Sequence, residues 1–392
     1  MRILVISFYY EPDLCAGSFR VTAFVNAMLN QLPIDAHIDV ITTLPNRYSS
    51  FTSEAPEFEH HQRLTVRRIS LSAHKSGMLD QSKAFVGFAK GVIHLTKGKD
   101  YDLVFATSSR LMTAALGAYV SRKNGNPLYL DIRDIFVDTI KDVLPKKITW
   151  VATPIFSLLE GWTLRAAKKV NLVSEGFLPY FQGSYPDSIF SHFTNGIDEE
   201  FIEVQSENSI SSIDKVLTVV YAGNMGEGQG LHSIIPELGR RFYGRLQFKL
   251  IGDGGRKRQL ISAVAASGLD NVEILPPIRR DELIKIYQDA DILFLHLNDY
   301  DAFKKVLPSK LFEYGALGKP IWAGVAGYAA DFIRENISNS AVFYPCNADD
   351  AVKSFESLEM VTQPRRTFVE RFARSNIMQK MAEDVISIAC GH

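Results

Sequence analysis

Cysteines, long apolar runs and an excess of charge of either sign are scarce in this sequence of 392 residues. The three cysteines, Cys15, Cys346 and Cys390, are far apart and match neither a disulfide framework nor zinc-ligand spacing, which indicates a reducing compartment. No apolar run is long enough for a bilayer, and the apolar N-terminus continues into polar residues without a small-residue cleavage site, so it is typical of a first β-strand. The formal net charge of −1 gives no basic surplus for a nucleic acid. A cytoplasmic protein without a nucleic-acid partner is therefore expected.

Short apolar runs alternate with helical patterns along the whole chain, which predicts parallel sheets built from βαβ units. One series of expected strands ends near residue 174, and a second series begins near residue 216. The segment 203–214 between them is rich in Ser, Glu, Asn and Asp and is interpreted as a linker. We therefore predict an α/β protein with two Rossmann-like, doubly wound domains, 1–202 and 215–370, facing a central cleft. The last segment, 371–392, is an expected helix that packs on the second domain or crosses back to the first.

The most informative segment is Pro308–Pro320, with the sequence PSKLFEYGALGKP. Ser309 favours a helix start and Gly318 favours a helix stop, and an apolar run that reads as a buried strand follows. A short helix with a lone carboxylate at the edge of a parallel sheet suits ligand binding. Glu313 can accept hydrogen bonds from a diol, and Lys310, one turn earlier, can meet a phosphate. The alternative is a surface helix on which these two side chains form an ion pair.

Two glycine-rich loops follow expected strands of the second domain. Gly223, Asn224 and Gly226 lie in the first loop, where glycines let backbone N–H groups approach an anion such as a diphosphate. The alternative is a plain connecting loop. Arg256 and Lys257 open the helix after the second loop, where their positive charge opposes the helix dipole unless an anion lies nearby. One of these two side chains is therefore a phosphate-binding candidate.

In the first domain, candidate residues follow the first strand and a later buried strand. Gly17 and Ser18 open the helix after the first strand, at the expected ligand-binding edge of the sheet. Asp131 and Asp134 flank an arginine at the end of the other strand, and either carboxylate can act as the general base. The competing interpretation is an Asp–Arg pair that braces the strand end.

The segment 146–169 has basic residues at both ends of an aromatic and aliphatic helical pattern. This pattern suits contact with a membrane surface, and a buried amphipathic helix is the alternative. Asp289 and Asp291 have the spacing of an Asp-x-Asp metal motif, but they precede a strand, which is the wrong end of a parallel sheet for a site. No metal is therefore expected.

In their order and spacing, several of these segments resemble bacterial family-4 glycosyltransferases with the GT-B fold, most closely those of surface polysaccharide or O-antigen assembly. The resemblance rests on the loop at Gly17–Ser18, residues 131–134, Glu160 with 165–167, the turn 195–198, the loops 222–226 and 251–254, and residues 308–320. It implies a nucleotide-sugar bound by the second domain, an acceptor bound by the first, and transfer with retention of configuration and without a bound metal or other cofactor.

The resemblance also implies roles for single residues. Glu313 would hold the ribose hydroxyls, the loop Gly223–Gly226 with basic residues would line the diphosphate, and the backbone near Ile278 would hold the base. The donor-binding candidates are Gly223, Asn224, Gly226, Arg256, Lys257, Ile278, Ser309, Lys310, Leu311 and Glu313. The dipoles and cations of the protein would then stabilise the departing diphosphate.

The sequence departs from the family pattern at three places. The family has paired glutamates seven residues apart, and Lys305 stands where the first is expected, so this residue is suited to contact a phosphate or an acidic sugar instead. The usual Arg–Lys pair after the first glycine loop is absent, and Lys310 with Arg256 or Lys257 are candidates to replace its charge. Arg133 stands where many relatives have a histidine, so no catalytic histidine is carried over.

The expected function is transfer of a sugar from a nucleoside-diphosphate-sugar, with UDP favoured, to a hydroxyl of a lipid-linked glycan on the inner face of the plasma membrane. Two alternatives stay open: a sugar-nucleotide epimerase of the same fold, and a nucleotide-sugar-binding protein that has lost catalysis. The epimerase needs histidines and carboxylates as acids and bases, and His296 is the one histidine clearly placed at a strand end. The sequence leaves the base, the sugar and the acceptor open.

Overall fold

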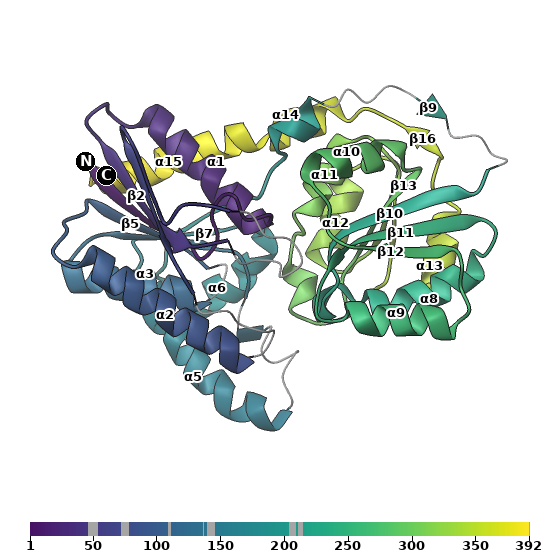
Figure 1. Cartoon of the computed structure of the whole chain (residues 1–392), viewed down its shortest axis with the longest axis horizontal. Coiled ribbons are helices and arrows are strands. Elements are labelled where there is room, and N and C mark those ends of the chain that lie inside the picture. Colours follow the sequence, from purple (N-terminus) through teal and green to yellow (C-terminus); the bar gives the residue numbers. More distant parts are fainter. Residues whose placement is uncertain are drawn as a thin grey trace. The chain divides into compact units, whose positions relative to one another are not determined.

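The computed structural model describes residues 1–45, 54–71, 78–108, 111–135, 137–138, 146–203, 209–210 and 215–391 (Figure 1). The chain divides into two compact units. Unit 1 comprises Met1–Asn195 and Ser375–His392, and unit 2 comprises Gly196–Arg374. Among the described residues, no helix has both the length and the apolar character needed to cross a membrane.

Unit 1 is built on a sheet of eight strands in the order β3-β4-β2-β1-β5-β6-β7-β8. All neighbouring strands run parallel except β3 and β4, which pair in the antiparallel direction. The strands are β1 (Arg2–Ile6), β2 (His37–Thr43), β3 (Phe58–His61), β4 (Leu64–Ile69), β5 (Leu103–Thr107), β6 (Leu128–Ile132), β7 (Lys169–Leu172) and β8 (Phe190–Ser191).

Helices cover both faces of this sheet. In Figure 1, α1 (Ala16–Gln31) and α15 (Arg374–Ala389) lie together on one face, and α2 (Met78–Thr96) and α3 (Leu111–Asn124) lie on the other. The buried side chains of α1 and α15 form one core with Ile3 and Val5, because alternate residues of β1 point to the same face. The remaining elements are α5 (Lys146–Leu164), η1 (Glu175–Phe177) and α6 (Leu178–Ser184).

Unit 2 is built on six parallel strands in the order β12-β11-β10-β13-β14-β15. The strands are β10 (Leu217–Asn224), β11 (Leu246–Asp253), β12 (Val272–Leu275), β13 (Ile292–His296), β14 (Ile321–Gly324) and β15 (Ser340–Phe343). The chain crosses from β12 over β10 to β13, so the strand order changes direction next to β10. Ligands of doubly wound sheets bind beyond the carboxyl ends of the strands at such a point.

The helices of unit 2 also form two layers. Buried residues of α8 (Leu231–Arg241), α9 (Lys257–Ala266) and α13 (Ala348–Phe355) pack on one face of the sheet. Figure 1 shows α10 (Arg280–Asp289), α11 (Lys310–Ala316) and α12 (Tyr328–Asn336) on the other face. The remaining elements are α7 (Glu199–Ile202), η2 (Glu227–Gln229), η3 (Phe303–Lys305), α14 (Arg366–Phe372) and the pair β9 (Ser209–Ile210) with β16 (Val361–Thr362).

The predicted α/β fold with two Rossmann-like sheets is confirmed, and two details differ. The strands β3, β8, β9 and β16 were not expected, because three of the four side chains of β3 are exposed and the other three strands are only two residues long. The divisions between the units fall at 195/196 and 374/375, so the expected linker 203–214 lies within unit 2. Residues 204–208 and 211–214 of that linker lie outside the described residues.

Backbone pairing explains the position of this boundary. The N–H of Ile197 donates to the carbonyl of Phe372 at 2.7 Å, and the N–H of Arg374 donates to the carbonyl of Ile197 at 2.8 Å. These bonds tie residues 196–203 to the end of α14. The helix α15 then begins at Arg374, and its buried side chains belong to the core of unit 1.

Candidate active site

The helix α11 starts and ends close to the expected positions. Ser309 is its N-cap by position, but its hydroxyl makes no capping hydrogen bond, unlike the expectation from sequence. Gly318 has a φ of +68°, and an added Cβ there would lie 2.6 Å from the carbonyl oxygen of Gln363. Glycine is therefore required at the helix stop, as the sequence predicted.

Lys310 lies against the first glycine loop. An added Cβ at Gly223 would come within 2.2 Å of the Lys310 Nζ, and Gly223 has a φ of +141°. The same Nζ lies 5.2 Å from the centre of the Tyr221 ring. Because Gly223 ends β10 and Lys310 opens α11, the structure brings together two segments that the sequence singled out separately.

Glu313 presents a carboxylate with unused hydrogen-bonding capacity. The carboxylate itself forms no hydrogen bond or ion pair with any described residue, so the alternative of an ion pair with Lys310 is not observed. Burial raises the pKa of Glu313, and the positive charges of Arg280 and Lys310 act in the opposite direction. A partly desolvated carboxylate beside two cations is well suited to accept hydrogen bonds from a neutral donor such as a diol.

Arg280 and Arg374 hold the surroundings of Glu313, and the sequence analysis singled out neither. Arg280 donates to the carboxylates of Asp198 and Glu200. Arg374 donates from Nη2 to the Asp198 carboxylate at 3.2 Å. Asp198 belongs to the turn 195–198, one of the segments on which the family resemblance rests. No sequence motif marks these arginines, because only the fold brings α10 and the end of α14 to that turn.

The two glycine loops pack backbone against backbone. An added Cβ at Gly252 would lie 1.8 Å from the carbonyl oxygen of Gly223, and one at Gly254 would lie 2.6 Å from the Met225 backbone. The N–H of Met225 donates to the carbonyl of Asp253 at 2.8 Å. Gly252 and Gly254 therefore serve the contact between the loops, and this contact shapes the end of β10.

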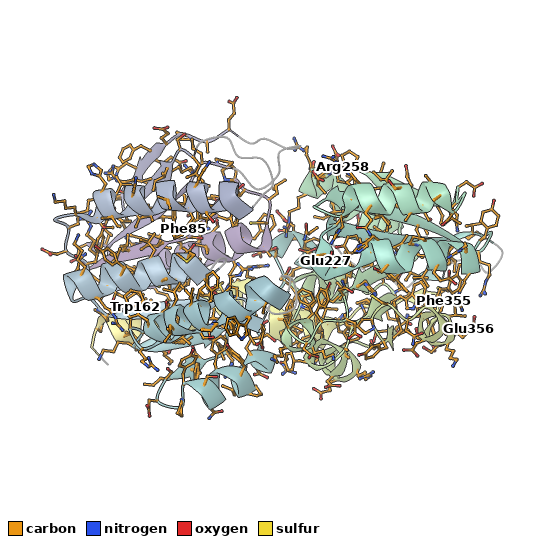
Figure 2. The ribbon with its side chains drawn as sticks, turned by 90° about the horizontal axis from the view of Figure 1, so that it is seen from below. Phe85, Trp162, Glu227, Arg258, Phe355 and Glu356 are labelled. Carbon is orange, nitrogen blue, oxygen red and sulfur yellow. The ribbon has the colours of Figure 1, made fainter. Side chains whose placement is uncertain are left out.

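The side chain of Gln229 braces the first loop from within. Its Oε1 accepts from the Asn224 Nδ2 at 2.7 Å and from the Gly226 N–H at 3.3 Å. The Gly226 N–H thus has a protein partner, which weakens its assignment as a diphosphate ligand. In Figure 2, Glu227 and Arg258 mark the end of unit 2 at which this loop lies.

The two basic residues of the second loop have partners. The Lys257 Nζ donates to the carbonyl oxygens of Gly252 at 2.7 Å and Leu275 at 3.1 Å, which joins the ends of β11 and β12. Arg256, about half exposed, pairs with Glu227 on the first loop. These contacts, rather than a phosphate, offset the positive charge at this helix start. The structure therefore gives Lys257 a bracing role instead of the expected phosphate contact.

His296 connects three loops at the ends of the unit 2 strands. Its Nδ1 is 2.7 Å from the carbonyl oxygen of Gln229, and its Nε2 accepts from the Cys346 N–H at 3.0 Å. Since a carbonyl only accepts, Nδ1 carries the proton and the imidazole is neutral. Burial lowers the pKa of His296 to about 4. With both ring nitrogens occupied, His296 is a structural residue and not the acid or base that an epimerase needs.

The backbone near Ile278 was expected to hold the base, and Leu311 was a donor-binding candidate without an assigned mode of contact. Ile278 lies between β12 and α10, and neither its N–H nor its carbonyl has a partner among the described residues. The Leu311 N–H, in contrast, donates to the carbonyl of Pro308 at 3.1 Å. The Ile278 backbone can therefore still form hydrogen bonds with the edge of the nucleotide base, whereas the Leu311 N–H already donates within the first turn of α11.

In unit 1, Asp131 braces the sheet and is not the general base. Its two oxygens each accept from Arg20 at 2.9 Å, and Oδ1 also accepts from Asn171 at 2.8 Å. Burial alone would raise the pKa of Asp131, but the charge and hydrogen bonds of Arg20 hold it below its ordinary value. A fully buried carboxylate paired in this way has no access to a substrate hydroxyl. Arg20, which sequence reasoning missed, is the strand-bracing arginine.

Asp134 and the loop at Gly17–Ser18 lie at the carboxyl ends of β6 and β1. Asp134 is exposed, so it can reach a substrate as the remaining carboxylate candidate. The Arg133 Nη1 donates to the Ala16 carbonyl at 3.2 Å, and an added Cβ at Gly17 would lie 3.2 Å from that nitrogen. Ser18 is buried, and its hydroxyl has no hydrogen-bond partner in the part of the chain that the structure describes. Arg133 thus links the Asp134 loop to the start of α1.

Part of the chain is similar in sequence to known proteins. Residues 205–374 match the family model "Glycosyl transferases group 1". A putative colanic acid biosynthesis glycosyl transferase, WcaI of Escherichia coli K12, is 32% identical over 111 residues, which is 28% of this chain and 27% of that protein. The match thus spans about a quarter of this curated relative.

Solved structures share the fold over nearly the whole chain. Sucrose-phosphate synthase from Thermosynechococcus elongatus has a TM-score of 0.76 at 13% identity, with all of both chains covered. HepE from Anabaena, solved in complex with UDP, has a TM-score of 0.66 at 17% identity, covering 99% of this chain and 100% of that one. WaaG, a glycosyltransferase involved in lipopolysaccharide biosynthesis, has a TM-score of 0.64 at 14% identity, covering 99% and 97%. These likenesses show a common fold.

Proposed function

We propose that the protein is a glycosyltransferase, because residues 205–374 match the family model "Glycosyl transferases group 1" and solved glycosyltransferase structures share its fold. It transfers a sugar from a nucleoside-diphosphate-sugar, with UDP favoured, to a hydroxyl of a glycan, with retention of configuration and without a bound metal. Its similarity to a putative colanic acid glycosyl transferase and to WaaG supports a role in surface polysaccharide assembly.

The observation that carries this proposal is the group formed by Gly223, Lys310 and Glu313. The Glu313 carboxylate has no partner among the described residues, so it can accept both hydrogen bonds of a ribose diol. The Lys310 ammonium lies against Gly223 at the end of β10, where it can contact the diphosphate. Its charge then stabilises the leaving diphosphate as the glycosidic bond to the donor breaks.

The remaining parts of the donor and the acceptor are assigned by chemistry. The unpaired backbone groups of Ile278 suit the edge of a base, which offers donors and acceptors in one plane. Asp134 and the Gly17–Ser18 loop occupy the carboxyl edge of the unit 1 sheet, where an acceptor hydroxyl is expected. The acceptor is a lipid-linked glycan, so the protein works as a peripheral protein at the inner face of the plasma membrane.

Substitution of Glu313 tests the donor site. We expect Glu313→Ala to fold and to bind UDP at least tenfold more weakly, since a hydrogen bond to a charged group contributes about 1.5–3 kcal/mol. Isothermal titration with UDP measures this loss. Glu335→Ala, at an exposed glutamate of α12 in the same unit, is the matched control. Equal UDP affinity of the Glu313 variant and the control would remove the ribose assignment.

Incubation with labelled nucleotide-sugars and membrane lipids tests the reaction. A labelled lipid product supports glycosyl transfer. A donor epimerised at one carbon instead supports an epimerase, and binding without turnover supports a protein that has lost catalysis. The fully engaged, neutral His296 argues against the epimerase.

A further inference from the structure

Unit 1 has an open groove of about 740 Å³ near the amino ends of β1 and β2. Gly17 and Asp134 follow the carboxyl ends of their strands, so the groove lies at the opposite edge of the same sheet. On β4, Thr65 and Arg67 line the groove. Ile69, at the carboxyl end of the same strand, packs against Gly91 of α2 instead. Its lining residues on the four neighbouring strands are Arg2, His37, Asp39, Phe58, His60, Thr65 and Arg67.

Three rings form a row along this groove. The Phe58 and His60 rings are 6.4 Å apart with an angle of 1° between their planes, and the His60 and His37 rings are 6.0 Å apart with an angle of 28°. Phe58 is 53% exposed, and the Arg67 guanidinium lies 4.8 Å from the centre of its ring. Such near-parallel rings offer an apolar surface for a flat ligand ring.

A single hydroxyl holds the two imidazoles. The Thr65 Oγ1 lies 2.8 Å from the His37 Nε2 and 3.0 Å from the His60 Nδ1. Because a hydroxyl can donate one bond and accept another, it fixes both rings and leaves the other nitrogen of each ring without a hydrogen-bond partner among the described residues. The groove therefore presents hydrogen-bonding groups in fixed positions beside apolar ring faces.

The charges of the groove nearly balance. Arg2 and Arg67 line the groove together with Asp35, Asp39 and Asp102, and the Arg2 Nη2 pairs with Asp39 at 2.6 Å. This balance disfavours a phosphate or another strongly charged ligand. The described residues also contain no group of three or more His, Cys, Asp or Glu side chains that can hold a metal. A neutral polar ligand fits these surroundings best.

We propose that this groove binds a neutral sugar residue of the glycan acceptor, remote from the hydroxyl that receives the new sugar; this inference rests on the proposed function. A sugar ring has a face of C–H groups that packs on aromatic rings, and hydroxyls that pair with imidazole, carboxylate and guanidinium groups. Holding an earlier part of the glycan would favour longer acceptors over short ones.

Nuclear magnetic resonance of the full-length protein with labelled histidines tests the inference. The probes are neutral gluco- and galacto-oligosaccharides of increasing length. The ring signals of His37 and His60 are expected to shift on addition of the longer oligosaccharides. We expect Phe58→Ala and His60→Ala to weaken binding about tenfold. His61→Ala, an exposed residue on the opposite side of β3, is the matched control and is expected to bind as the wild type does.

The outcomes separate this inference from the proposed function. Unshifted His37 and His60 signals with every probe, in a protein that binds UDP, would overturn the groove assignment alone. Equal affinity of the Phe58 and His60 variants and the control would do the same. Absence of UDP binding and sugar transfer would instead count against the proposed function, whatever the histidine signals show.

Discussion

At the scale of single residues, the position of Lys310 depends on Gly223 having no side chain. An alanine Cβ at position 223 would lie 2.2 Å from the lysine nitrogen, and the φ of +141° disfavours any side chain. The lysine nitrogen is the far end of a flexible chain, so it can move away rather than disrupt the fold. The position of the Lys310 ammonium is therefore sensitive to a single methyl group added at residue 223.

We expect Gly223→Ala to weaken UDP binding by displacing Lys310 and to lower the free energy of unfolding by about 1–3 kcal/mol through backbone strain. A double-mutant cycle with Lys310→Ala, measured by UDP titration and urea unfolding, separates the two effects. In the Lys310→Ala background, the effect of Gly223→Ala on binding should disappear and its effect on stability should remain. Additive losses of affinity would show that the glycine acts independently of the lysine.

Asp131 illustrates a residue whose role depends on its partners. Removing one charge of its buried pair with Arg20 leaves the other uncompensated, so Asp131→Asn should lower the free energy of unfolding by about 3–5 kcal/mol. The turnover of the enzyme that remains folded should be nearly unchanged. Urea unfolding and activity per folded molecule measure these two quantities. Lost turnover at unchanged stability would restore Asp131 as the general base.

At the scale of elements, His296 joins the end of β13 to the first glycine loop and to the loop after β15. Its protonated Nδ1 donates a hydrogen bond to the Gln229 carbonyl, and its Nε2 accepts one from the Cys346 N–H. Protonation of Nε2 would break the second bond and bury a charge. The arrangement of the loops at the candidate donor site is therefore coupled to the neutral state of one imidazole.

This coupling predicts a pH dependence of stability. The pKa of His296 is about 4 in the folded protein and 6.5 for the unperturbed side chain, so the unfolded chain binds more protons between these values. The contribution of His296 is complete above pH 6.5 and falls by up to about 3 kcal/mol as the pH approaches 4. We expect His296→Gln to lose this component of the acid-side decrease in unfolding free energy, measured by urea titration at several pH values. Parallel decreases in the two proteins would exclude His296 as the source.

At the scale of the whole molecule, the last helix of the chain, α15, completes the core of unit 1. Met378, Met381 and Val385 of α15 are fully buried in the unit 1 core with α1 and β1. Asp384 accepts from Tyr129 at 2.8 Å and pairs with Lys169 at 2.5 Å. Unit 1 is thus assembled from two distant parts of the chain.

Truncation after Arg374 should therefore destabilise unit 1 and leave unit 2 folded. Loss of three buried apolar side chains alone removes several kcal/mol, at about 1.5–3 kcal/mol each. Calorimetry should show a lower transition for unit 1, while UDP should still raise the transition of unit 2. The full-length chain is the control. A single cooperative transition that shifts as a whole would contradict independent cores.

Sequence reasoning found the segments of the candidate site but not their contacts. Gly223, Lys310 and Glu313 stood out because glycine after a strand and a charged, capped helix have local signatures. Arg20 and Arg280 did not, because an arginine within a helix has the same local pattern whether it is solvated or buried against a carboxylate. For the same reason, Lys257 was one of two candidates for the phosphate contact, although its nitrogen donates to two carbonyls.

The sequence alone determined the two-sheet α/β architecture, because alternation of apolar runs and helical periods is a local property of the chain. It also determined the stop of α11, because only glycine tolerates the backbone there. The tertiary structure decided which charged groups have protein hydrogen-bond partners and which can still bind a ligand. Asp131, Lys257 and His296 gain their partners from elements far apart in the sequence, whereas the Glu313 carboxylate has no partner among the described residues and is left for a ligand.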